Sequence, residues 1–269
     1  MESRWIRLPA LLGAAISLLT ACSVKEDRSP CPCLLTVDLS ETLNESVTPV
    51  SLWDKGLKLS VSDAGKHVFY SASYDYDSVR PEYCISVNRG DVIVAGILGV
   101  DKGLVSGTEY HVSENCQADR LFVSSSMVEC DGEESYCALK MYKQYSEIRI
   151  SGLDSLDYRM EVVAGCAGLD LQTRRALPGQ FRYELSCDDD GLCCFRMPRQ
   201  SDDELQIIMY DASGHMSKSI PLGMYMTDMG YDWDAESLSD VTVNVDKVTV
   251  AVTISINGWS GSIKFPFTI

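Results

Sequence analysis

The sequence predicts an all-β protein built from two tandem antiparallel β-sandwiches. Short segments in which apolar and polar residues alternate recur along the chain, as in "CLLTVDLS" (residues 33–40) and "GLKLSVS" (residues 56–62). Turn-forming residues such as Asn88-Arg89-Gly90-Asp91 and Asp131-Gly132 separate these segments. This alternation is typical of sheets with one buried face. Only a short helix is expected, near Trp233 to Leu238, where acidic residues suit a first turn.

The length of the chain sets the domain organisation. It has 269 residues, which is enough for two domains of ordinary size. The alternating segments fall into two sets of about seven, the strand number of a typical sandwich. We place an N-terminal sandwich at residues 34–143 and a C-terminal sandwich at residues 144–269. No Pro- or Ser-rich linker marks the boundary, so the two sandwiches are expected to pack closely.

The composition argues against nucleic-acid binding. The chain has 23 Lys and Arg against 39 Asp and Glu, a formal charge of −16 at pH 7. A surface this acidic repels phosphate backbones. The hydrophobic content of 45% supports a packed core rather than disorder.

The first residues have the pattern of an export signal. Arg4 and Arg7 form a positive start, and the mostly apolar stretch from Leu8 to Ala21 is too short for a comfortable membrane span. Residues 1–21 are therefore expected to be a signal peptide. A buried core helix is the less favoured alternative.

Cys22 follows this segment in a recognisable context. Leu19-Thr20-Ala21-Cys22 resembles the bacterial lipobox, which implies cleavage before Cys22 and its acylation, with palmitate as a typical chain. Several acyl chains on one residue give lasting membrane attachment. The alternative is an ordinary signal peptide with an incidental cysteine. Residues 22–33 then form a lipidated tether, and Lys25-Glu26-Asp27 resembles the signal that directs Bacteroidetes lipoproteins to the cell surface.

The remaining cysteines indicate disulfides or buried thiols. The chain has eleven cysteines, so an even number remains once Cys22 carries lipid. An even count in an exported protein permits disulfides, although the sequence leaves their connectivity open. Cys31-Pro32-Cys33 and Cys193-Cys194 lie far in sequence from any histidine, which disfavours a zinc site.

No motif predicts catalysis, a metal or a cofactor. The chain has no Gly-x-Ser-x-Gly, His-Glu-x-x-His or Gly-x-x-x-x-Gly-Lys pattern. Asp188-Asp189-Asp190-Gly191 invites a calcium-loop interpretation, but Arg199 falls where the final Glu is required, so a tight turn is favoured. Tyr70, Tyr74 and Tyr76 offer a sugar-stacking surface, but core or cross-strand packing is the favoured role.

The C-terminal segment "SIKFPFTI" (residues 262–269) is typical of an edge strand. Ile263, Phe265, Phe267 and Ile269 would face one way. Pro266 cannot donate a ladder hydrogen bond and so suits the edge of a sheet.

Two stretches carry a family resemblance. "EDRSPCPCLLTVDLS" (residues 26–40) and "LGMYMTDMGYDWDAESLSDVTVNVDKVTVAVTISINGW" (residues 222–259), together with the lipobox, resemble the fimbrial anchor lipoproteins of Bacteroidales, the anchor subunits of the major and minor fimbriae. Residues 41–200 match in strand character alone. The resemblance implies two transthyretin-like sandwiches and a non-catalytic role, either at the base of a fimbria or as a minor subunit.

The resemblance also implies the partners. Such an anchor is attached to the outer membrane through the lipid on Cys22, binds a pilin of the fimbrial shaft, ends assembly and limits fibre length. Subunits join by inserting a strand of one into a groove on the next. We therefore expect the C-terminal strand, with Ile263, Phe265, Pro266, Phe267 and Ile269, or the groove beside it, to contact a neighbouring subunit. The alternative is an ordinary edge strand that closes the second sandwich.

The first strand is expected to stay in the mature protein. Pilins of this class resemble one another in losing an N-terminal strand after cleavage at Arg or Lys. Here Arg28 lies in the tether, and no basic residue follows it before Lys55. We therefore expect the strand from Leu34 to Ser40 to be retained, as suits an end piece. A carbohydrate-binding surface lipoprotein is the alternative function, because β-sandwiches also carry sugar sites.

Overall fold

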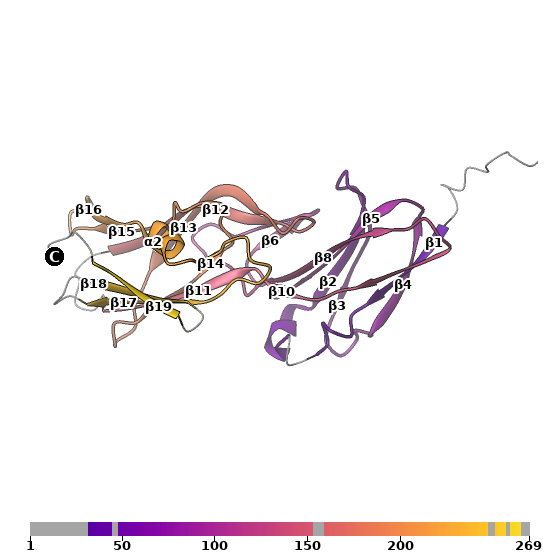
Figure 1. Cartoon of the computed structure of the whole chain (residues 1–269), viewed down its shortest axis with the longest axis horizontal. Coiled ribbons are helices and arrows are strands. Elements are labelled where there is room, and N and C mark those ends of the chain that lie inside the picture. The colour runs from indigo at the N-terminus through magenta and orange to yellow at the C-terminus, as the bar shows by residue number, and fades with distance from the viewer. Residues whose placement is uncertain (1–31, 45–47, 153–158, 247–250, 257–258, 265–269) are drawn as a thin grey trace, which may run out of the picture.

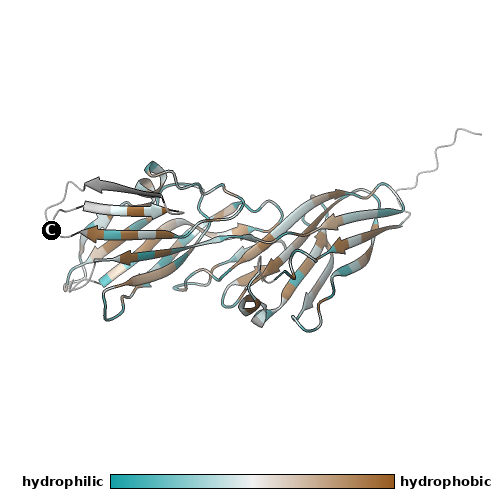
Figure 2. Ribbon diagram, turned by 60° about the horizontal axis from the view of Figure 1, so that its bottom comes forward, coloured by the Kyte–Doolittle hydropathy of each residue, from teal (hydrophilic) through white to brown (hydrophobic). Residues whose placement is uncertain are grey.

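The computed structural model of the chain describes residues 32–44, 48–152, 159–246, 251–256 and 259–264. Within these residues strands predominate and form four sheets. Figure 1 shows an elongated molecule with two groups of strands placed end to end. Apolar and polar residues alternate along many strands, as Figure 2 shows by colour. The predicted all-β fold is confirmed.

The first sandwich consists of two sheets, with strand orders β4-β1-β9 and β10-β8-β5-β2-β3. All neighbours pair antiparallel except β1 and β9, which are parallel. Its elements are β1 (Pro32–Asp38), the 3-10 helix η1 (Val50–Lys55), β2 (Leu57–Ser62), β3 (Val68–Tyr74), β4 (Glu82–Asn88), β5 (Asp91–Leu98), β8 (Phe122–Glu129), β9 (Glu134–Ala138) and β10 (Tyr142–Lys143). The alternating apolar residues of the two sheets face one another and form one core.

The second sandwich has strand orders β14-β11-β17-β18-β19 and β16-β15-β12-β7-β6, with β13 also paired to β12. Its elements from the C-terminal half are β11 (Tyr145–Ser151), β12 (Arg159–Asp170), β13 (Ala176–Leu185), β14 (Cys193–Pro198), β15 (Gln206–Tyr210), β16 (Met216–Ile220), α2 (Leu222–Asp228), β17 (Val241–Asp246), β18 (Ala251–Ile256) and β19 (Trp259–Lys264). A second core lies between these sheets, and α2 contributes Leu222 and Met226 to it.

A hairpin from the first half of the chain completes the second sandwich. β6 (Leu104–Ser106) and β7 (Glu109–His111) follow β5, yet β7 pairs with β12 through Tyr110 and Leu169. Figure 1 shows β6 beside the second group of strands. A third apolar cluster, which includes Ile97, Tyr110 and Leu169, lies at this junction. The division of the chain at residues 143 and 144 stays a prediction, and this hairpin shows that strand pairing crosses it.

The helix predicted near Trp233 to Leu238 is wrong. Residues 233–237 form turns and bends, and a helix occurs earlier, as α2. The buried Arg199 guanidinium explains the difference, because it donates to the carbonyls of Trp233 and Ala235 and so holds them in a loop. These tertiary bonds replace the helical hydrogen bonds that the acidic residues seemed to favour.

Candidate functional site

β1 lies in the middle of a sheet and is fully engaged on both sides. It pairs antiparallel with β4 and parallel with β9. Leu35 and Val37 on its inner face have no exposed surface, whereas Leu34 on the outer face is 43% exposed. The backbone N–H and C=O groups of this strand are therefore used within the first sandwich.

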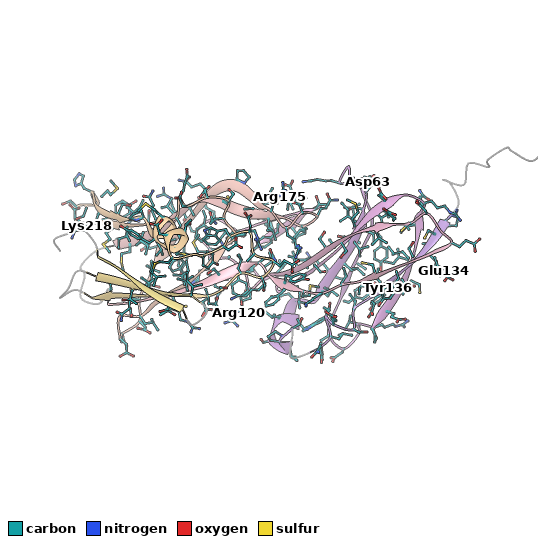
Figure 3. All side chains as sticks on the ribbon, in the orientation of Figure 1. Asp63, Arg120, Glu134, Tyr136, Arg175 and Lys218 are labelled. Carbon is teal, nitrogen blue, oxygen red and sulfur yellow. A yellow bond between two sulfur atoms is a disulfide. The ribbon has the colours of Figure 1, made fainter. Side chains whose placement is uncertain are left out.

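Side-chain contacts fix the end of β1. Asp38 accepts hydrogen bonds from the Ser40 backbone N–H at 2.8 Å and from the Tyr136 hydroxyl on β9. The bonds from Ser40 and Tyr136 lower the pKa of Asp38. Figure 3 shows Glu134 and Tyr136, both on β9, toward the outer end of the first sandwich. The strand is thus tied to its parallel neighbour β9 by a side chain as well as by the sheet ladder.

β19 is placed differently, at the edge of its sheet. Among the described strands it pairs only with β18, with Ile263 opposite Val252. One row of its backbone N–H and C=O groups therefore has no strand partner among the described residues, which is the geometry required for adding a strand.

Of the predicted contact residues, the structure describes only Ile263, through its backbone pairing on β19. Phe265, Pro266, Phe267 and Ile269 lie outside the described residues, as does Cys22. Their roles stay predictions.

A surface hollow of about 590 Å³ lies over β12, β13 and β15. Its lining residues are Val163, Ala164, Gly165, Gly179, Gln180, Glu204, Gln206 and Ile208. The glycines make room for it: a Cβ on Gly165 would lie 3.0 Å from a carboxylate oxygen of Asp202 and 3.1 Å from one of Glu204. The sequence analysis missed this hollow, and its only signal was the placement of glycines within strand-like segments.

The hollow sits where β12 changes neighbours, from β15 to β7. At this point the buried Gln200 side chain takes the place of a neighbouring strand. Its amide accepts from the Cys166 N–H and donates to the Cys166 carbonyl, both at 3.0 Å. The backbone at the gap is therefore satisfied.

The aromatic residues considered for sugar stacking pack against the first core. Tyr70 and Tyr74 share a hydrogen bond of 2.5 Å between their hydroxyls. Tyr76 meets the buried Trp53 edge to face, with ring centroids 5.4 Å apart. Each tyrosine is partly buried against the core. The favoured packing role is thus confirmed.

The acidic stretch at Asp188 is a tight turn, as predicted. The Asp188 carboxylate accepts from the N–H groups of Asp190 at 3.1 Å and Leu192 at 2.8 Å, and Gly191 has a φ of 74°. A disulfide between Cys187 and Cys193 closes the turn. Over the described residues, no group of three or more His, Cys, Asp or Glu side chains is arranged to hold a metal ion.

The described part of the chain also contains no helix with the length and apolarity needed to cross a membrane.

Comparison with known proteins identifies the fold. No protein-family model matches the chain, and no curated protein sequence matches it. Among solved structures, the fimbrial anchor protein Mfa2 from Porphyromonas gingivalis is similar with a TM-score of 0.61 and 12% identity, covering 86% of this chain and 99% of Mfa2.

Two Bacteroides structures are similarly close. A protein of Bacteroides thetaiotaomicron, assigned as a candidate polysaccharide-binding protein, gives a TM-score of 0.60 at 14% identity over 86% of this chain and 98% of its own. A candidate adhesin from Bacteroides ovatus gives 0.56 at 13% identity over 86% and 95%. The predicted tandem β-sandwich fold, and the resemblance to fimbrial anchors at the level of fold, are confirmed.

Proposed function

We propose that this protein is a non-catalytic surface lipoprotein that serves as the anchor or a minor subunit of a fimbria. The observation that carries the proposal is the fold: the same tandem sandwiches occur over 99% of the fimbrial anchor Mfa2. In this role the lipid on Cys22 holds the protein in the outer membrane, and strand-mediated contacts hold the fibre and limit its length. The lipobox supports the attachment.

The proposed contact with the pilin is the edge of the second sandwich. β19 leaves one row of backbone groups without a strand partner among the described residues. A strand from a pilin would satisfy these groups by β-augmentation. The proposed contact residues are Ile263, Phe265, Pro266, Phe267 and Ile269. Pro266 suits an edge strand because it has no backbone N–H to donate to a neighbouring strand.

The position of β1 favours an end piece over a repeating shaft subunit. A shaft subunit that gives up its first strand must have a sandwich that tolerates the loss. Here removal of β1 would leave both β4 and β9 without their neighbour and would open the first core. N-terminal sequencing of surface material tests this point. A mature start beyond Leu34 would count against the anchor role.

The proposal is tested by capture from the membrane. An epitope inserted in the exposed turn between Ser213 and Gly214 avoids both ends of the chain. Purification from detergent-solubilised outer membrane, with the co-purifying proteins identified, is expected to yield a pilin. Cys22→Ala should release the protein and its fibres into the medium. If no fimbrial subunit co-purifies under crosslinking, the proposal is wrong.

The contact strand is tested by truncation. Deleting residues 261–269 is expected to leave a folded lipoprotein that no longer captures pilin. Folding is checked by circular dichroism of the purified variant. Persistent capture would exclude the C-terminal strand as the contact, whereas loss of folding would assign it a structural role.

Carbohydrate binding is the second candidate, and the hollow over β12 is the observation that favours it. Gln180, Glu204 and Gln206 offer amide and carboxylate groups around a floor that contains two glycines. Paired amide and carboxylate groups suit sugar hydroxyls. Glycan-array binding of the purified protein that is lost in Gln206→Ala would support this function. Absence of binding to any glycan would exclude carbohydrate binding as a function.

A further inference from the structure

Two buried cysteines of the first sandwich, Cys33 and Cys130, belong to the same apolar core cluster. Cys33 lies at the start of β1, and Cys130 directly follows β8, so they belong to opposite sheets. Both side chains have no exposed surface and belong to the same apolar cluster. A buried thiol is usually inert, and one thiol alone would be ordinary core packing. Here two thiols from different sheets meet.

The backbone around both cysteines is firmly placed. The Cys130 N–H donates to the Gly90 carbonyl at 3.0 Å, and the Gly90 N–H donates back at 3.3 Å. Next to Cys33, the Leu34 N–H donates to the Glu133 carbonyl at 2.8 Å. The short connection between β8 and β9 is therefore bonded to both regions. This holds the two cysteines at the same end of the sandwich.

The side chains themselves are in contact. The Cys33 thiol donates to the Ser135 hydroxyl at 3.5 Å. Burial raises the pKa of the Cys130 thiol to about 11, while a hydrogen bond with Ser135 lowers it and the charge and hydrogen bond of Cys33 raise it. The two thiols are thus neighbours of one hydroxyl, that of Ser135, in the same closed part of the core, and a disulfide requires such neighbouring cysteines.

We propose that Cys33 and Cys130 form a disulfide in the exported protein, which joins β1 covalently to the end of β8. In this step the two thiols lose two protons and two electrons, and an S–S bond forms between them. The electrons and protons pass to an external disulfide, that of a thiol–disulfide oxidoreductase, whose S–S bond breaks to give two thiols. Because the folded site is closed to solvent, the exchange takes place while β1 is docking.

The other described thiols have different surroundings. Cys84 lies exposed on β4 with its sulfur 3.8 Å from the Thr36 hydroxyl. Cys137 on β9 is buried, and its thiol hydrogen-bonds with Ser126. Cys166 lies 3.2 Å from the Ser201 hydroxyl. These residues provide matched controls, because they are cysteines that the structure places beside hydroxyls.

The bond would change how the first sandwich responds to load. It closes a loop of about 100 residues, the kind of crosslink that constrains the unfolded chain most. It also ties together the two sheets at the end where the chain enters the fold. If the protein is lipid-anchored as proposed, a pull from the membrane reaches β1 first and passes through this bond into both sheets. The disulfide itself does not depend on that function.

Peptide mapping tests the proposal directly and needs no variant. The full lipoprotein is purified from membranes, denatured with N-ethylmaleimide present, digested without reductant and analysed by mass spectrometry. The expected result is a linked pair of peptides that contain Cys33 and Cys130, with Cys84 and Cys137 alkylated. Alkylation of Cys33 or Cys130 as the main species, or a link from Cys33 to Cys31, overturns the proposal.

Thermal unfolding provides the second test. Reductant should lower the Tm of the wild-type protein more than that of Cys33→Ala, by an extra amount on the order of 10 °C. Cys130→Ala and the double variant should behave as Cys33→Ala does. Cys137→Ala should keep the wild-type response to reductant. Because every variant retains the Cys187–Cys193 bond, its reduction cancels in the comparison. Equal shifts in wild type and Cys33→Ala overturn the proposal.

Discussion

The first and last described strands of this protein are held in opposite ways. β1 is the middle strand of its sheet, whereas β19 pairs only with β18 among the described strands. A middle strand has its backbone groups occupied on both sides, while an edge strand keeps one row for another chain. Among the described strands, a further strand can pair with β19 without displacing a neighbour, whereas at β1 it would have to displace β4 or β9. The proposed end-piece role relies on this difference.

Proline substitutions in β1 and β19 test this difference and should give the largest changes in the free energy of unfolding. Thr36→Pro removes an N–H from β1, which has no free side, so we expect a loss of roughly 3 kcal/mol or more in the free energy of unfolding. Successive N–H groups of β19 point to opposite sides. One of Ser260→Pro and Gly261→Pro should therefore be tolerated and the other not. Urea denaturation followed by circular dichroism measures all three. If both β19 variants are equally destabilised, the outer side of this strand is already paired.

Alanine substitutions at two neighbouring leucines, one buried and one exposed, test how β1 is oriented in its sheet. Leu35 has no exposed surface, so Leu35→Ala should reduce the free energy of unfolding by about 3 kcal/mol through lost burial and a cavity. Leu34 neighbours it on the same strand and is 43% exposed, so Leu34→Ala should change the value by less than about 0.5 kcal/mol. Similar effects for the two variants in urea denaturation would show that β1 is not held as the structure places it.

The hairpin β6–β7 is an intermediate case, because it leaves one sandwich to join the other. The buried Asp119 holds its entry: the carboxylate accepts the backbone N–H groups of Asp101 and Lys102 at 3.0 Å and of Gly103 at 2.8 Å. Asp119→Ala leaves these donors unpaired and should cost about 2 kcal/mol. Asp101→Ala removes only an exposed side chain and is the control, with an expected change below about 0.5 kcal/mol. Thermal melts that cannot separate the two variants would contradict this role for Asp119.

The local pattern of the sequence predicted what each strand buries, but not which strands pair across the molecule. Alternation in residues 33–40 predicted a strand with one buried face, and the structure buries Leu35 and Val37 on that face of β1. The pairing of Tyr110 on β7 with Leu169 on β12 was not predictable, since nothing in a three-residue strand specifies a distant partner.

The predicted sites show the same limit. The turn at Asp188 could be predicted from the sequence, because its carboxylate accepts hydrogen bonds from N–H groups only two and four residues further along the chain. The disulfide from Cys187 to Cys193 and the placement of Cys33 and Cys130 in one core cluster needed the fold, since spacing alone does not set connectivity. The hollow beside Gly165 depends on where β15 ends and β7 begins, which is a property of the assembled sheet.

The smallest expected effect comes from an ion pair that joins the two sandwiches. Lys66, in the turn between β2 and β3, lies 2.6 Å from a carboxylate oxygen of Asp170 on β12. Burial alone would raise the pKa of Asp170, but the hydrogen bond from Lys66, with those from the Thr173 and Gln172 N–H groups, outweighs it and lowers the pKa below its ordinary value. A carboxyl whose pKa is lower in the folded state stabilises the protein above its unfolded pKa of about 3.9, and this stability disappears as pH falls through the folded value.

We therefore expect the free energy of unfolding of the wild-type protein to fall more steeply than that of Lys66→Met when pH is lowered from about 5 to about 2. At neutral pH the same variant should lose less than about 1 kcal/mol, because the Lys66 side chain is 43% exposed and the pair is screened. Lys55→Met is the control: its pair with Asp101, 3.4 Å long and more than half exposed on both sides, should leave the slope unchanged. Parallel pH profiles for the wild-type protein and Lys66→Met would mean that this pair does not join the sandwiches in solution. The junction would then depend on the backbone pairing of β7 with β12 and on the apolar cluster around Tyr110.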